Sequence, residues 1–131
     1  YIKFVSLTVN AGSYEKHEAK LSILIDDKTV KISSNGNGPV DATFNAIKIL
    51  TKTNFKLKLY QVHAITAGTD AQGEVTVRLE DDQFTSQAKG SDPDIIVASA
   101  KAYINALNKL IFKKSKSSSK EHIASLKIEG V

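Results

Sequence analysis

Two segments of this 131-residue chain repeat one another at a fixed offset of 54 residues. The segment LSILIDDKTV begins at Leu21, and the similar segment VTVRLEDDQF begins at Val75. Without a gap, the same offset carries Gly36 onto Gly90 and Pro39 onto Pro93. A repeat of this kind means that one structural unit is present twice, so the fold has to be built from two similar halves.

The hydrophobic pattern predicts the elements of each copy. Apolar residues alternate with a period of two where strands are expected, as in Val5, Leu7 and Val9, and with a period near 3.6 after Pro39. The first copy predicts strands at 3–9, 21–25 and 29–34 and a helix at 39–51. The second predicts strands at 55–65, 73–80 and 83–88 and a helix from about 94 to 112. The element order is therefore βββα followed by βββα.

Neither copy could cover its own sheet, so we expect one α+β domain in which units 1–54 and 55–113 share a core. Two three-stranded sheets leave unpaired edges, which favours a homodimer that covers them. The Lys- and Ser-rich residues 114–131 are predicted to be a solvated C-terminal tail. Nothing at the start resembles a signal peptide and no run of 18 apolar residues occurs, so we expect a cytoplasmic protein without a membrane contact.

Composition argues against several classes of function. The chain has no Cys, which excludes disulfides and thiolate metal sites. Its three histidines are scattered, and the Asp26-Asp27 and Asp81-Asp82 pairs fall in predicted turns, so we expect neither a metal site nor a catalytic pair. Residues 109–120 hold five Lys and no acidic residue, so they account for the net charge of +4, and the rest of the chain is nearly balanced. A nucleic-acid module remains a distant alternative, suggested by the tail and by Lys56 and Lys58.

The stretch NGNGPVD, residues 35–41, precedes the first predicted helix, and GSDPD precedes the second. A helix N-terminus presents unpaired N–H groups and a partial positive charge, which suit an anion such as a carboxylate. Gly36 and Gly38 are expected to allow close backbone approach and positive φ angles, and Pro39 begins the helix. The same residues also make an ordinary strand-to-helix turn. The pattern alone leaves both interpretations open.

Three motifs occur in a specific order: NGNGPVDATFNAI, AITAGTDAQGEV and DIIVASAKAYINALN. Together they closely resemble the C-terminal regulatory domain of the 2-isopropylmalate synthase family, whose relatives include citramalate synthase. The resemblance extends from Tyr1 to Lys113. In that family the regulatory domain is also a duplicated βββα unit, and residues after Lys113 lie outside the similarity.

The resemblance implies an allosteric role. In the family, an N-terminal (β/α)8 barrel condenses acetyl-CoA with a 2-oxo acid and uses a divalent metal, and the regulatory domain binds the end-product amino acid as a feedback inhibitor. A barrel of that kind needs roughly 250 residues, so we expect no catalysis and no cofactor in this fragment of an acyltransferase. Leucine is the expected effector; isoleucine, as in citramalate synthase, is the alternative. The resemblance also implies a homodimer, and it implies no binding of nucleic acid.

The resemblance also implies an effector pocket. The first helix entrance, the first strand of the second unit with its following loop, and the second helix entrance contribute Gly36, Gly38, Pro39, Val40, Leu57, Tyr60, Ala64, Ala71, Asp92 and Pro93. Under ideal alternation Leu57 and Tyr60 face opposite sides of their strand. Both can line one pocket only if the strand bends or bulges between them. Ala64 is expected to leave room for the γ-branch of leucine.

Overall fold

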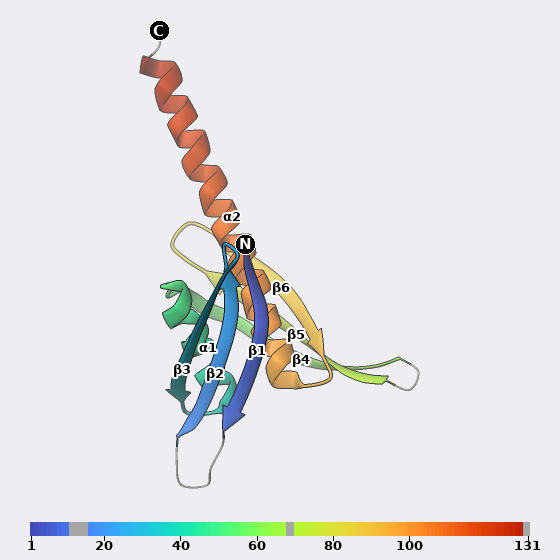
Figure 1. Cartoon of the computed structure of the whole chain (residues 1–131). Helices are drawn as coiled ribbons and strands as arrows, with labels where there is room; N and C mark the ends of the chain where they lie inside the picture. Colours follow the sequence, from blue (N-terminus) through green and yellow to red (C-terminus); the bar gives the residue numbers. More distant parts are fainter. Residues whose placement is uncertain (11–15, 68–69, 130–131) are drawn as a thin grey trace.

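The computed structural model describes residues 1–10, 16–67 and 70–129, and it contains two copies of a βββα unit (Figure 1). The elements of the first copy are β1 (Ile2–Asn10), β2 (His17–Ile25), β3 (Lys28–Gly36) and α1 (Pro39–Thr51). Those of the second are β4 (Lys56–Ala67), β5 (Asp70–Glu80), β6 (Thr85–Asp92) and α2 (Ile95–Glu129). The predicted α+β fold of two βββα units is confirmed.

Each unit folds into its own antiparallel sheet, with strand orders β1-β2-β3 and β4-β5-β6. The hairpin between β2 and β3 turns through two residues, Asp26 and Asp27, whose φ angles are 50° and 66°. Two consecutive left-handed residues make the turn that matches the twist of paired strands. The hairpin between β5 and β6 is longer, because β5 and β6 pair only as far as Glu80 and Thr85.

The two turn lengths change the register of the third strands. Leu21 pairs with Ile32 in the first sheet, whereas Val75, its partner in the sequence repeat, pairs with Gly90. Gly90 therefore occupies the sheet position of Ile32, although the sequence repeat aligns it with Gly36. The repeat predicted two similar units correctly, but it does not give the pairing of β6.

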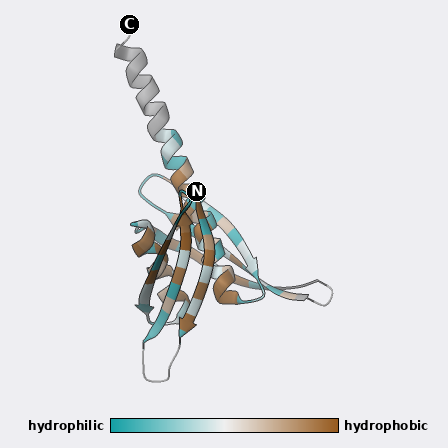
Figure 2. Ribbon diagram, in the orientation of Figure 1, coloured by the Kyte–Doolittle hydropathy of each residue, from teal (hydrophilic) through white to brown (hydrophobic). Residues whose placement is uncertain are grey.

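One core joins the two units. Helix α1 packs on β2 and β3, and α2 packs on β5 and β6 but also contacts β1 and α1. Figure 2 shows apolar residues along the strands, α1 and the first part of α2. The largest fully buried apolar side chains come from both copies: Leu21, Ile23, Ile47, Val75, Val77, Leu79, Tyr103, Leu107 and Leu110. Burying such side chains is the main favourable contribution to folding.

Polar side chains of α2 hold it between the two sheets. The Asn108 amide accepts a bond from the N–H of Ile2 at 3.0 Å and donates to the Ile2 carbonyl at 2.8 Å. On the other side, Asn105 donates to the carbonyl of Lys89 at 2.9 Å. These bonds occupy backbone groups of the edge strands β1 and β6, which would otherwise be open to another strand.

Both N-terminal strands contain a β-bulge. In β1 the register shifts between Phe4 and Ser6, and Val5 is 47% exposed, so the expectation that Val5 shares a buried face with Leu7 was wrong. An extra residue in one strand reverses the alternation on one side of it. In β4 the register shifts between Leu57 and Leu59.

Helix α2 is longer than predicted. The pattern indicated an end near Phe112 and a tail from 114, but the backbone remains helical as far as Glu129. No Gly or Pro interrupts residues 95–129, and Lys and Ser do not break a helix as those residues do. The first of these lysines also contact the body of the domain, because Lys113 donates to the carbonyl of Thr85 and Lys114 forms an ion pair with Asp81.

The segment Ile95–Ser117 of α2 is long and apolar enough to cross a membrane by length and composition. Half of it is buried inside the domain, where Tyr103, Leu107 and Leu110 belong to the core. We therefore interpret this segment as a core helix.

Candidate functional site

The entrance to α1 leaves backbone donors open. Gly38 is the N-cap residue, and among the described residues no side chain caps this helix. Pro39 occupies the first turn, and Ala42 donates to the Gly38 carbonyl at 2.9 Å. The N–H groups of Val40 and Asp41 precede this first helical bond, so they point out of the N-terminus. They can donate hydrogen bonds to an anion there, and the helix dipole adds a partial positive charge.

The entrance to α2 is different, because the side chain of Asp94 caps the helix. One carboxylate oxygen of Asp94 accepts bonds from the N–H groups of Ile96 at 2.7 Å and Val97 at 3.3 Å. These are the donors that an incoming anion would use. The two helix entrances, which the sequence suggested were equivalent, therefore differ in their capacity to hold a carboxylate.

The glycines before the helices do not adopt positive φ angles, so that expectation was wrong. Gly38 is extended, with φ −163° and ψ 171°, and no described residue beyond its chain neighbours comes within 4 Å of the place where a Cβ would be. At Gly36 a Cβ would lie 2.4 Å from the nitrogen of Ala42, and at Gly90 it would lie 2.4 Å from the nitrogen of Ala102. Gly36 and Gly90 are thus required for close packing of strand on helix, and Gly38 borders open space.

Tyr60 connects the two units. Its phenolic oxygen lies 2.7 Å from Ser99 Oγ on α2, and its ring meets the ring of Phe44 on α1 edge to face, with centroids 5.8 Å apart. Phe44 in turn packs on Tyr103 at 4.6 Å. Tyr60 is therefore the residue of the predicted pocket that touches both helices.

The bulge in β4 places the predicted pocket residues of this strand on one face. Leu57, Tyr60, Val62 and Ala64 pair across β5 with Leu79, Val77, Val75 and Gly73, and side chains of directly paired residues share a face. The β5 partners lie on the core side, where Val75, Val77 and Leu79 are fully buried. The bulge meets the condition under which Leu57 and Tyr60 could line one pocket, and the pocket itself stays a prediction.

The core-side face of β4 is nevertheless only partly covered. Leu57 is 41% exposed and Val62 is 46% exposed, although both lie beside buried residues of β5. Ala64 is also exposed. This β4 strip, which we define as Leu57, Val62 and Ala64, is an apolar surface next to Tyr60.

The second helix entrance lies beside one end of the β4 strip. Gly73 pairs with Ala64 on one side and with Asp92 on the other, and a Cβ on Gly73 would overlap the Ile95 side chain. The Asp92 carboxylate accepts bonds from the Asp94 N–H at 2.9 Å and from Lys101 at 3.1 Å, and these bonds hold the pKa of Asp92 below its ordinary value. Pro93 and Ala71 are exposed, and Ala71 pairs farther out along β4 with Thr66.

Residues 1–111 match the family model of the LeuA allosteric (dimerisation) domain. The chain belongs to this family. It is 54% identical over 110 residues to a 2-isopropylmalate synthase of Afipia carboxidovorans, covering 84% of this chain and 21% of that protein. It is 52% identical over 124 residues to a 2-isopropylmalate synthase of Bradyrhizobium sp. (strain ORS 278), covering 95% of this chain and 24% of that protein. The chain therefore spans about a quarter or less of these relatives.

In this LeuA-family domain the predicted residues fall into two groups. The first surrounds the α1 entrance and the second follows β4 to the α2 entrance. The contact of Tyr60 with Phe44 links β4 to α1. Three cavities formed by described residues lie elsewhere, and the effector pocket remains a prediction. Sequence reasoning missed Ser99 and Ile95. Nothing in their apolar helical surroundings distinguishes them from core residues. Phe44, in contrast, belongs to the apolar residues at helical spacing after Pro39.

Proposed function

We propose that this chain is the feedback-inhibition domain of a 2-isopropylmalate synthase and that its effector is leucine. Family membership and the names of the relatives support a regulatory domain of such an enzyme. The parent would then be an acyltransferase with a separate catalytic barrel. The observation that carries the binding proposal is the uncapped N-terminus of α1, which differs from the Asp94-capped N-terminus of α2.

The carboxylate of the amino acid binds at the α1 entrance in this proposal. The N–H groups of Val40 and Asp41 donate to it, and the open space beside Gly38 admits it without displacing a side chain. A charged acceptor strengthens such bonds relative to neutral ones. Asp41 already accepts a bond from the Asn37 N–H at 2.9 Å, and its second carboxylate oxygen offers a partner for the ammonium group.

The side chain of the effector packs toward Tyr60 and the β4 strip. Leucine branches at Cγ, and the small Ala64 leaves room at the far end of the pocket, whereas isoleucine branches at Cβ and needs width near the backbone. The discrimination is modest, because moving one methyl in an apolar pocket changes binding by about 1 to 3 kcal/mol. An isoleucine-sensing domain, as in citramalate synthase, is the alternative that this difference tests.

The domain also acts as a homodimer in this proposal. The family is described as a dimerisation domain, and the β4 strip offers an apolar surface on an edge strand. Exposed apolar area of this kind is commonly covered by another subunit. A closed two-fold contact would use the same strip on both copies.

Titration calorimetry with leucine, isoleucine and valine tests the effector. We expect leucine to bind most tightly, Ala64→Ile to weaken leucine roughly ten- to a hundredfold, and Gly38→Val to weaken all three. Gly38 is extended with open space around it, so this substitution is compatible with the fold. Thr29→Val, an exposed substitution on β3, is the control. Tighter binding of isoleucine than leucine would favour the alternative that the parent is a citramalate synthase. No binding of any amino acid would refute the proposal.

Sedimentation at micromolar concentration tests the dimer. Val62→Glu should give a monomer, because it places a charge in the β4 strip. The matched control is Gln61→Glu, which adds the same charge one residue away on the opposite face of β4, where Gln61 pairs with Thr76. A monomer at every concentration for the unmodified chain, or equal effects of both substitutions, would contradict this interface.

A further inference from the structure

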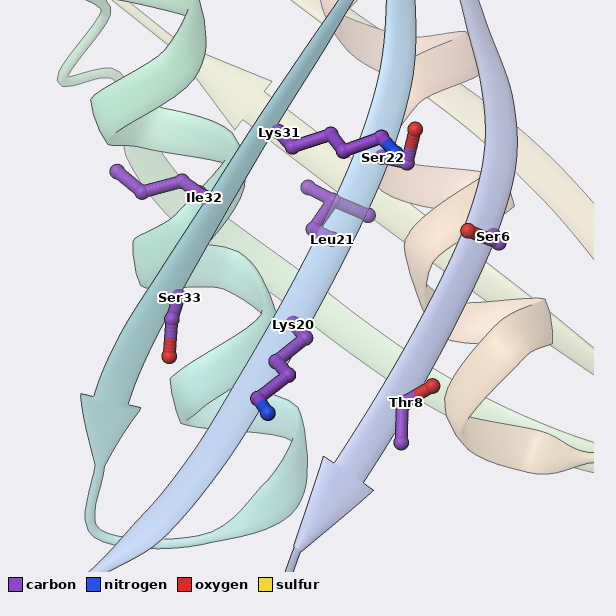
Figure 3. Close-up of a pocket in the computed structure, with 8 residues that line it drawn as sticks. All are labelled: Ser6, Thr8, Lys20, Leu21, Ser22, Lys31, Ile32 and Ser33. Atoms are coloured by element: carbon purple, nitrogen blue, oxygen red, sulfur yellow. The ribbon is translucent and has the colours of Figure 1, made fainter.

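The outer face of the first sheet, opposite its core side, holds a cavity of about 400 Å³ (Figure 3). Two cross-strand rows form it. Ser6, Ser22 and Lys31 pair in one row across β1, β2 and β3, and Thr8, Lys20 and Ser33 pair in the next. Directly paired residues share a face, so two ammonium groups and four hydroxyls gather on one surface. Among the described residues that line this cavity, none carries a carboxylate.

Ser22 is the unusual member of this group. The residue is only 6% exposed, and its hydroxyl oxygen is buried without a hydrogen-bond partner among the described residues. In Figure 3 the Lys31 side chain runs across β2 toward Ser22. A buried hydroxyl without a partner is costly, and such a group in a native structure needs an explanation. The hydroxyl would have a partner if Lys31 moved aside and a ligand oxygen accepted a hydrogen bond from Ser22.

The second sheet provides an internal comparison for the charge of this surface. Its corresponding rows are Gln61, Thr76, Lys89 and His63, Glu74, Ser91. Lys89 thus occupies the place of Lys31, but Glu74 occupies the place of Lys20. Glu74 forms an ion pair with Lys89 at 3.5 Å, so a carboxylate accompanies the cation on that sheet.

The two lysines of this surface are less well paired among the described residues, because Lys20 has only a long ion pair and Lys31 has none. Lys20 lies 3.9 Å from Glu18, and the Lys20 side chain is 61% exposed, which makes the pair weak. Among the ion pairs that the described part of the chain forms, none involves Lys31. Two units built on one plan therefore differ at one position in a way that leaves positive charge over a hydroxyl-lined cavity.

We propose that this surface binds a small, multiply charged oxyanion, such as a phosphate ester or a polycarboxylate. Lys20 and Lys31 supply the opposite charge, and the hydroxyls of Ser6, Ser22, Thr8 and Ser33 donate to the remaining oxygens. Charged acceptors favour both kinds of donor. This site lies on a different face of the sheet from the leucine pocket proposed above and does not depend on it.

Amide NMR titration of the 131-residue chain with inorganic pyrophosphate, at constant ionic strength held with sodium chloride, tests the proposal. We expect saturable shifts at residues 6, 8, 20, 22, 31 and 33, and none at 61, 74 or 89. A parallel titration with citrate distinguishes phosphate from carboxylate oxygens as the preferred group. Binding of either at these residues supports the site. Shifts that do not saturate, or that chloride alone reproduces, mean an adventitious ion only and overturn it.

Three variants sharpen this experiment. Lys20→Glu reproduces the arrangement of the second sheet and should weaken pyrophosphate binding by at least about tenfold. Ser22→Ala should weaken it severalfold without lowering the melting temperature, because it removes a hydroxyl that has no partner among the described residues of the unliganded domain. Lys89→Gln, the matched control on the second sheet, should leave the affinity unchanged. Equal effects of Lys20→Glu and Lys89→Gln would overturn the proposal, as would an unchanged affinity in Lys20→Glu.

Discussion

The phenolic hydroxyl of Tyr60 donates a hydrogen bond to Ser99 Oγ at 2.7 Å and so ties the edge strand β4 to helix α2. The direction follows from the second bond of Ser99, whose hydroxyl donates to the Ile95 carbonyl at 2.7 Å and has no further proton to give. The same Tyr60 ring contacts Phe44 of α1. One side chain therefore joins both helices next to the proposed effector pocket.

Replacing Tyr60 by Phe should lower the free energy of unfolding by about 0.5 to 1.5 kcal/mol, the usual net value of one hydrogen bond. The loss stays small because Ser99 keeps its bond to Ile95. Tyr60→Leu should cost more, since it also removes the edge-to-face contact with Phe44. Urea unfolding measures both. Equal stability of the Phe variant and the unmodified chain would show that this bond contributes nothing.

Gly36→Ala and Gly90→Ala should each destabilise the domain by about 1 to 3 kcal/mol or more, as expected for overpacking. The added methyl would meet backbone atoms of α1 or α2 at 2.4 Å, and backbone cannot move aside as a flexible side chain can. Gly38→Ala is the control, because its site is open and extended, and it should cost only about 0.5 to 1 kcal/mol for the loss of a favourable N-cap residue. Thermal unfolding of the three variants measures these effects. A large loss of stability in Gly38→Ala alone would contradict the conclusion that Gly36 and Gly90 are the glycines required for packing.

Tyr103→Phe should leave stability unchanged or raise it by about 1 kcal/mol. Tyr103 is fully buried, its hydroxyl has no partner among the described residues, and this burial raises the pKa of the phenol to about 12. Removing the hydroxyl relieves an unsatisfied group and leaves the ring packed on Phe44. A drop of more than about 1 kcal/mol in denaturant unfolding would mean that the hydroxyl is bonded in solution.

Asp81 should link stability to pH in the acid range. Bonds from Lys114, then from the N–H groups of Gln83 and Phe84, lower the pKa of Asp81 from 3.8 to about 2. Because the folded pKa is the lower one, the stabilisation is complete above pH 3.8 and is lost as the pH falls toward 2.

Carboxyl NMR titration checks this assignment. Lys114→Gln should raise the Asp81 pKa but leave it below 3.8, since the two backbone bonds remain. Lys116→Gln is the control, because Lys116 lies over the Phe112 ring and away from this pair. An unchanged Asp81 pKa in Lys114→Gln would show that the ion pair does not form.

Local pattern predicted the units but not how they differ. The repeat at Leu21 and Val75 and the period-two alternation were sufficient for βββα twice, because each strand buries one face and each helix one stripe. The pocket implied by the resemblance needed a bend or a bulge between Leu57 and Tyr60, and a bulge is present. The sequence could not place the bulge at Val5, because an extra residue leaves no trace in the composition of a strand.

The sequence by itself determined the duplication, the fold class, the start of α1 at Pro39 and the family resemblance, all of which depend on residue type and spacing along the chain. The tertiary structure alone decided the rest. The longer β5–β6 turn places Gly90 opposite Val75, the Asp94 carboxylate closes the α2 N-terminus while that of α1 stays uncapped among the described residues, and Tyr60 reaches Ser99 across 39 residues. These features depend on register, on side-chain rotation and on contacts between distant segments, and no local pattern encodes them.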